Sequence, residues 1–155
     1  FCTSLFAFQY GRYVGPVSLS LGNISCVLSD NSYNSVNPAT ISCGKSKISA
    51  FYHNKFLVPE LGLENFSLVY SHPTLSFSAN VSHHGYTEYG EMSVGVNFSR
   101  LFKPYISVGI GAEYLGWYYT GAWHSMACFN LGVMVMPISN LNIGGRETDN
   151  GRNQS

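Results

Sequence analysis

The residues that could bind a metal or react as nucleophiles are few in this 155-residue chain, and they are widely spread. The four cysteines, Cys2, Cys26, Cys43 and Cys128, include no Cys-x-x-Cys pair, which argues against a structural zinc site. Cys26 and Cys43 could form a disulfide in an oxidising compartment. Buried free thiols are the interpretation that we favour.

Two neighbouring histidines carry the best ligand chemistry in the sequence. His83 and His84, with Glu88 and Glu91, could form a surface metal site, because imidazole and carboxylate groups both bind metal ions. A histidine pair in a long polar loop is more often only solvated, so we expect no metal and no other cofactor. Serine is common throughout the chain, no Gly-x-Ser-x-Gly motif is present, and no nucleophile, base and acid can be assigned to one another. We therefore expect no catalytic residues and no enzyme activity.

The composition excludes several classes of protein. Charged residues make up 10% of the chain and the formal net charge is zero, whereas a typical soluble domain has about 25% charged residues. The chain has no basic patch for nucleic acid, and it is too apolar and aromatic for disorder. No uncharged apolar run reaches the roughly 18 residues that a membrane-spanning helix needs. Abundant Ser, Gly, Tyr and Asn instead favour a sheet with little charge on either face.

Alternating apolar and small polar residues predict strands over most of the chain. The alternation is regular at 17–22, 66–71, 74–82, 93–99, 105–114 and 127–135, and residues 47–58 are strand-like but less regular. One face of these strands is apolar and the other is small and neutral, which is typical of a membrane barrel. We predict an all-β, antiparallel, up-and-down transmembrane β-barrel, or part of one, with about seven or eight strands. The candidate lumen-facing residues are Ser76, Ser78, Asn80, Asn97, Ser107 and Glu113.

The predicted connections alternate between short and long. Short turns are expected at 71–74, 100–104 and 136–140, and long loops at 82–91 and 116–124, as in barrels with short periplasmic turns and longer outer loops. Aromatic residues gather where strands meet the long loops, which predicts a girdle at the membrane interface. A sugar-binding aromatic loop of a soluble protein is the alternative. The candidate girdle residues are Tyr86, Tyr89, Trp117, Tyr118, Tyr119 and Trp123.

The two ends of the chain differ from the middle. Residues 1–8 look like the remnant of a signal peptide, with an ordinary buried strand as the alternative. Residues 9–144 are expected to hold the strands and loops. Residues 145–155 carry no large apolar side chain, so we expect a disordered polar tail. Outer-membrane barrels usually end on a strand with a terminal aromatic residue, so either the barrel continues in a longer parent protein or the membrane interpretation is wrong.

Several segments are similar to a known family. The stretch Asp30–Ala39 resembles a segment near the start of fatty-acid-transporter-like outer-membrane barrels, which include the PorV-type barrels of type IX secretion. Within it, Asn37-Pro38-Ala39 resembles the Asn-(Pro/Gln)-Ala-Gly step of these proteins, with Thr40 in place of the usual glycine. Residues 52–61 and 85–92 resemble two further segments of uncharacterised members. The resemblance covers roughly residues 15–144.

This resemblance implies a porin-like protein in the outer membrane of a Gram-negative bacterium. The implied partners are outer-membrane lipid and either a hydrophobic ligand or a component of the secretion system, and the implied role is passive transport of small or hydrophobic molecules or docking of secretion partners. The family-like turn of Asp30, Asn37, Pro38 and Ala39 would lie in or beside the lumen, whereas simple turn chemistry is the alternative that we favour.

Two other functions stay open. One is a soluble, secreted β-sheet protein that binds lipid or sugar, with Trp117 and Trp123 at its mouth. The other is a fragment of a larger barrel with no function of its own.

Overall fold

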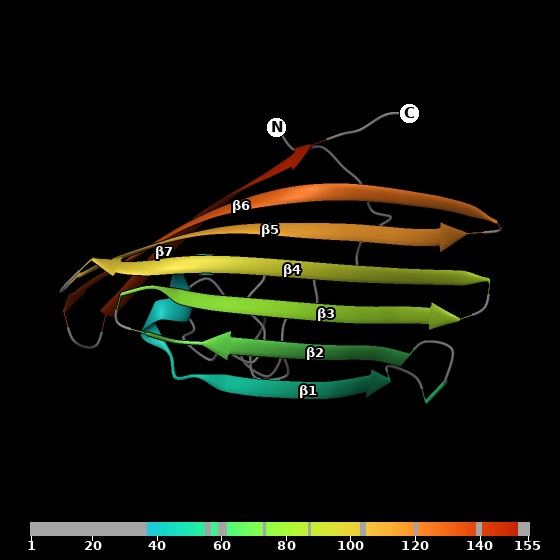
Figure 1. The fold of residues 1–155 in the computed structure, drawn as a ribbon, viewed down its shortest axis with the longest axis horizontal. Helices are drawn as coiled ribbons and strands as arrows, with labels where there is room; N and C mark the ends of the chain where they lie inside the picture. Colours follow the sequence, from blue (N-terminus) through green and yellow to red (C-terminus); the bar gives the residue numbers. More distant parts are fainter. Residues whose placement is uncertain are drawn as a thin grey trace.

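The computed structural model describes residues 37–54, 57–58, 62–72, 74–86, 88–102, 105–119, 121–138 and 141–151. In this part of the chain, seven strands follow one short 3-10 helix and form a single sheet in the order β1 to β7 (Figure 1). No helix here is long and apolar enough to span a membrane. The elements are η1 (Pro38–Cys43), β1 (Lys47–Asn54), β2 (Gly62–Tyr70), β3 (Ser76–Tyr86), β4 (Tyr89–Phe102), β5 (Ile106–Tyr119), β6 (Ala122–Ile138) and β7 (Leu141–Gly151).

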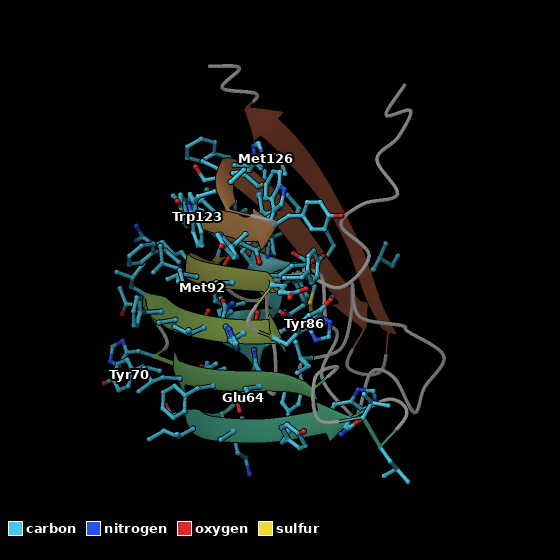
Figure 2. The ribbon with its side chains drawn as sticks, turned by 90° about the vertical axis from the view of Figure 1, so that its right-hand side faces the viewer. Glu64, Tyr70, Tyr86, Met92, Trp123 and Met126 are labelled. Carbon is cyan, nitrogen blue, oxygen red and sulfur yellow. The ribbon has the colours of Figure 1, made fainter. Side chains whose placement is uncertain are left out.

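The predicted all-β, up-and-down arrangement is confirmed, because each strand pairs antiparallel with the next one along the chain. Closure into a barrel is not observed. Among the described strands, β1 and β7 each have one neighbour, so the sheet is open. A view along the strands shows the sheet curling so that β6 and β7 swing toward one side (Figure 2). Since seven strands alternate in direction, β1 and β7 run the same way, and a direct pairing between them would be parallel.

The connections differ from those predicted at one end of the sheet. Most residues of the expected long loops at 82–91 and 116–124 belong to strands, and only two residues separate β3 from β4 and β5 from β6. Gly121 lies between β5 and β6 with φ +87°, a backbone conformation that residues with a side chain rarely adopt. Polar residues suggested loops because loops are usually polar. Here one face of the sheet is itself polar, so polar residues continue the strands.

The polar segment near the C-terminus also differs from its prediction. Residues 145–155 were expected to be disordered, but β7 runs to Gly151 and pairs with β6 as far as Ala127. Backbone hydrogen bonds to a neighbouring strand do not require apolar side chains, which is why the composition of this segment misled the prediction.

The two faces of the sheet have opposite polarity. We call the face that carries η1 the inner face and the opposite one the outer face. Side chains of the outer face are apolar yet exposed, and Tyr70 and Trp123 lie on this side while Tyr86 lies on the other (Figure 2). Exposed apolar residues of the outer face include Phe66, Val81, Val94, Val96, Phe98, Ile106, Val108, Ile110, Phe129, Leu131 and Val133. Buried polar residues of the inner face include Asn65, Ser67, Ser82, His84, Glu91, Ser93, Ser99 and Asn130.

This polarity is the reverse of that of a water-soluble sheet, which buries its apolar face and exposes its polar one. The packed core lies on the inner face, where η1 contacts β4, β5 and β6. Its most buried apolar side chains include Ala39 and Ile41 of η1 and Met134 of β6. The fold therefore presents an apolar surface outside and a polar, partly plugged surface inside.

Candidate functional site

The structure places all six candidate lumen-facing residues on the inner face. Their exposed fractions are 0–7%: Ser76, Ser78, Asn80, Asn97, Ser107 and Glu113. Neighbouring strands bring them into register, because Ser78 pairs with Asn97 and the Asn97 amide donates to Ser78 Oγ at 3.1 Å. The alternation of the sequence thus identified one shared, buried, polar face. That this face lines a lumen stays a prediction.

Two buried amides on this face have no hydrogen-bond partner among the described residues. Both side-chain polar atoms of Asn65 and of Asn80 are unpartnered. Asn80 lies over Gly95, where an added Cβ would come 2.6 Å from the amide oxygen. Buried polar atoms nearly always have a partner, so this part of the inner face is suited to contacts with water or a polar ligand. A dry hydrophobic core would not retain such groups.

At one end of the inner face, η1 packs onto two glycines, and we call this end the η1 end. Asn37, Pro38 and Ala39 of the family-like turn are buried there, while Asp30 lies outside the described residues. A Cβ added at Gly109 would come within 3.0 Å of Pro38 and Ala39, and one added at Gly132 within 3.0 Å of Asn37 and Pro38. The two glycines therefore form a seat that lets the backbone of η1 lie against the sheet.

Turn chemistry shapes η1 itself. The Asn37 side chain caps the helix by accepting a hydrogen bond from the backbone N–H of Ala39 at 3.0 Å. Ser107 Oγ donates to the Ala39 carbonyl at 2.7 Å and lies 2.6 Å from Ser42 Oγ, which ties η1 to β5. The capping role expected for Asn37 is present, and the same residue also lies on the inner face.

Replacing Asn37 with alanine should lower the free energy of unfolding by about 1–2 kcal/mol, because the capping oxygen is lost. Asn37→Ser should recover part of this loss, since a serine hydroxyl can still cap. Equilibrium unfolding in urea of the three proteins provides the measurement. Equal stability of Asn37→Ala and the unmodified protein would contradict the capping role.

At the opposite end, which we call the aromatic end, the six candidate girdle residues do not share one face. Register pairing places Tyr118 and Trp123 together on the outer face, where the Trp123 ring covers Gly116. It places Tyr86, Tyr89, Trp117 and Tyr119 on the inner face. The prediction that all six residues form one outward-facing girdle is therefore wrong. Successive side chains of a strand alternate between faces, which the loop assignment had hidden.

The four inner-face rings lie beside two histidines and a carboxylate. Tyr89 and Tyr119 pack edge to face, with centroids 6.4 Å apart, and Trp117 stacks on His124 at 5.5 Å. Glu91 pairs in register with His84 on one side and Trp117 on the other. Glu91 is 5% exposed and accepts a hydrogen bond from the Tyr89 hydroxyl. Sequence reasoning had treated this carboxylate as part of a loop.

The expectation that both histidines of the pair are solvated is wrong for His84. His83 is exposed on the outer face, whereas His84 is buried on the inner face with Nδ1 3.0 Å from the Gly62 carbonyl. The two imidazoles thus point to opposite sides of β3. Within the described residues, no three His, Cys, Asp or Glu side chains are arranged to hold a metal ion.

Neither of the described cysteines forms a disulfide. Cys43 is half-buried in η1 and Cys128 is buried in β6. Burial raises the pKa of the Cys43 thiol, although its hydrogen bond with Ser42 lowers it in part. Cys26, the other candidate for a disulfide with Cys43, lies outside the described residues.

Comparisons of this chain with protein-family models, with curated proteins and with solved structures find no match. The resemblance to fatty-acid-transporter-like barrels therefore remains a prediction from the residues.

Proposed function

We propose that this chain is an outer-membrane β-barrel protein, or most of one, that carries small or hydrophobic molecules passively or docks a secretion partner. The observation that carries the proposal is the reversed polarity of the sheet. Ile110, Leu131 and Phe129 are more than half exposed on the outer face, while Ser76 and Ser107 are fully buried on the inner face. Lipid is the solvent in which this arrangement is favourable.

The length of the apolar outer surface fits a membrane. In β5, the outward residues from Ile106 to Tyr114 cover nine positions, or about 26 Å along the strand. A transmembrane strand needs about 9–11 residues. Polar outer residues follow in the next register row toward the aromatic end, where Glu64 lies opposite His83. Arg100, near the other end of the band, directs its guanidinium over Phe102, 5.3 Å from the ring centroid.

The proposal requires at least one further strand to cover the open edges of the sheet at β1 and β7. Unpaired strand edges are not tolerated in lipid, so β1 and β7 must both be covered in a membrane. A strand placed between them would be antiparallel to both, because β1 and β7 run in the same direction. The sequence predicts one such strand at residues 17–22, which lie outside the described residues, and a longer parent protein could supply others.

The soluble alternative rests on the aromatic end. A secreted β-sheet protein could use the inner-face rings for a ligand, as lipid- or sugar-binding proteins do. It would then have to leave a large apolar outer face in water, which soluble monomers rarely do. We therefore favour the membrane function.

Detergent partitioning and heat-modifiable gel migration test the proposal on the purified chain. A closed membrane barrel should require detergent and should migrate differently when unboiled than when boiled. A water-soluble monomer would overturn the membrane function. Detergent-dependent aggregates that migrate equally with and without boiling would show that this chain alone does not close a barrel.

A further inference from the structure

We propose that the inner face at the aromatic end binds a small organic ammonium ion, with Glu91 as its counter-ion and Trp117 and Tyr89 as its aromatic walls. The residues of the site lie on β3, β4, β5 and β6, so the site does not require the sheet to cross a membrane. Two successive register rows of the inner face compose it: His84, Glu91, Trp117 and His124 in the first, and Tyr86, Tyr89 and Tyr119 in the second.

The first argument is the state of the Glu91 carboxylate. It is 5% exposed, and one of its oxygens accepts from Tyr89 while the other, Oε2, is buried without a hydrogen-bond partner. A buried carboxyl oxygen without a partner is unfavourable unless a donor or a positive charge contacts it. The neighbouring His84 turns its Nδ1 to the Gly62 carbonyl instead of Oε2. A positively charged ligand would supply the missing partner.

The second argument is the set of rings around this carboxylate. Trp117 stacks on His124 of β6 with ring centroids 5.5 Å apart, and Glu91 of β4 is the register partner of Trp117 on the other side. Tyr89 and Tyr119 pack edge to face in the adjoining row. The faces of such rings carry negative electrostatic potential and attract ammonium groups. The carboxylate and the rings therefore favour the same charge on the ligand.

The same two features select against a neutral sugar. A sugar could stack on Trp117, but it carries no positive charge to pair with the Glu91 carboxyl group. An inorganic metal ion would need more ligands than this cluster offers, since the described residues form no metal-binding group. A compact organic cation meets both requirements.

Access to the carboxylate is through the rim of the aromatic end. Tyr86 and Tyr119 lie there and are 47% and 60% exposed. Exposed side chains change rotamer readily, so these two rings can swing aside and admit a ligand.

The chain offers a clean fluorescence test, because its two tryptophans lie on opposite faces. In a Trp123→Phe protein, all tryptophan emission comes from Trp117 at the proposed site. Choline should quench this emission saturably, and its neutral isostere 3,3-dimethyl-1-butanol should bind at least about tenfold more weakly. Equal quenching by the two compounds, or no saturable quenching by choline, would overturn the proposal. This comparison needs no substitution at Glu91.

A pair of carboxylate variants provides the second arm. Glu91→Gln in the same background should weaken choline binding at least about tenfold, whereas Glu64→Gln, which alters an exposed carboxylate of the outer face, should leave it unchanged. Equal effects of the two substitutions would overturn the role of Glu91. Dihexanoyl-phosphatidylcholine, used below its micelle concentration, distinguishes the source: tighter binding than choline identifies a lipid headgroup, and weaker binding identifies a free ammonium compound.

Choline binding can be measured by tryptophan fluorescence in detergent or in water. Failure of this test and failure of the membrane proposal are therefore separate results. Choline binding to a water-soluble monomer would support the site and overturn the membrane function. Heat-modifiable migration without choline binding would support the membrane function and overturn the proposed ammonium site.

Discussion

Ile110→Lys should lower the free energy of unfolding in lipid vesicles by about 2–4 kcal/mol. Ile110 is 55% exposed at the middle of the outer apolar surface, between Phe98 of β4 and Leu131 of β6. A lysine on the lipid face costs about 2–4 kcal/mol at the bilayer midplane and about 0–1 kcal/mol near the interface. A loss of this size is a large share of the stability of a small protein.

The same change has a very different effect if the outer face contacts water. An exposed surface substitution then typically alters stability by less than about 0.5 kcal/mol. The experiment compares urea unfolding in vesicles for Ile110→Lys and for Glu64→Lys, whose site lies on the same face beyond the apolar band. We expect a large loss for the first and a small one for the second. Equal stabilities would mean that Ile110 does not face lipid.

Gly109→Ala should lower the free energy of unfolding by about 1–3 kcal/mol, the usual cost of overpacking. A Cβ there would press on the backbone of Pro38 and Ala39, which cannot move aside as a flexible side chain can. Either η1 shifts off its seat or β5 bends. Gly132→Ala should cost a similar amount, because its closest contact is the side-chain oxygen of Asn37, whose displacement would break the helix cap.

Gly145→Ala is the matched control, since a Cβ at that glycine of β7 would meet no atom within 4 Å. Urea unfolding compares the three variants. Alkylation of Cys43, followed by mass spectrometry of its peptide, reports on η1 directly. Displacement of η1 should expose this half-buried thiol and speed its reaction several-fold. A Gly109→Ala protein as stable as Gly145→Ala, with unchanged alkylation, would show that η1 does not depend on its glycine seat.

The faces of β3 and β4 were predicted correctly from the sequence. Ser76, Ser78, Asn80 and Asn97 were assigned to one face by their alternation, and the structure buries all four on that face. Period-two alternation is a local property of a strand, so it can be read without knowing the partners. Glu113 was assigned to the polar face in the same way, and it too is buried there.

The prediction from the sequence was wrong where polar residues were assigned to loops. His84 and Glu91 were placed in a long loop, yet both are buried strand residues paired across β3 and β4. The usual link between polar residues and loops assumes a sheet with an apolar interior. Counting the alternation onward from Ser82 would have placed His84 on the inner face, and counting back from Ser93 would have placed Glu91 there.

By itself, the sequence determined strands in the regions of β1 to β6, the two faces of these strands and the low content of charged residues, because alternation and composition are carried by each segment alone. Only the tertiary structure decided what depends on which segments meet. It decided that the turn at Asn37 caps a helix seated on Gly109 and Gly132, and that Glu91 lies between His84 and Trp117. It also decided that the described sheet is open. These features arise from pairing between residues distant in the chain, and no local pattern records such pairing.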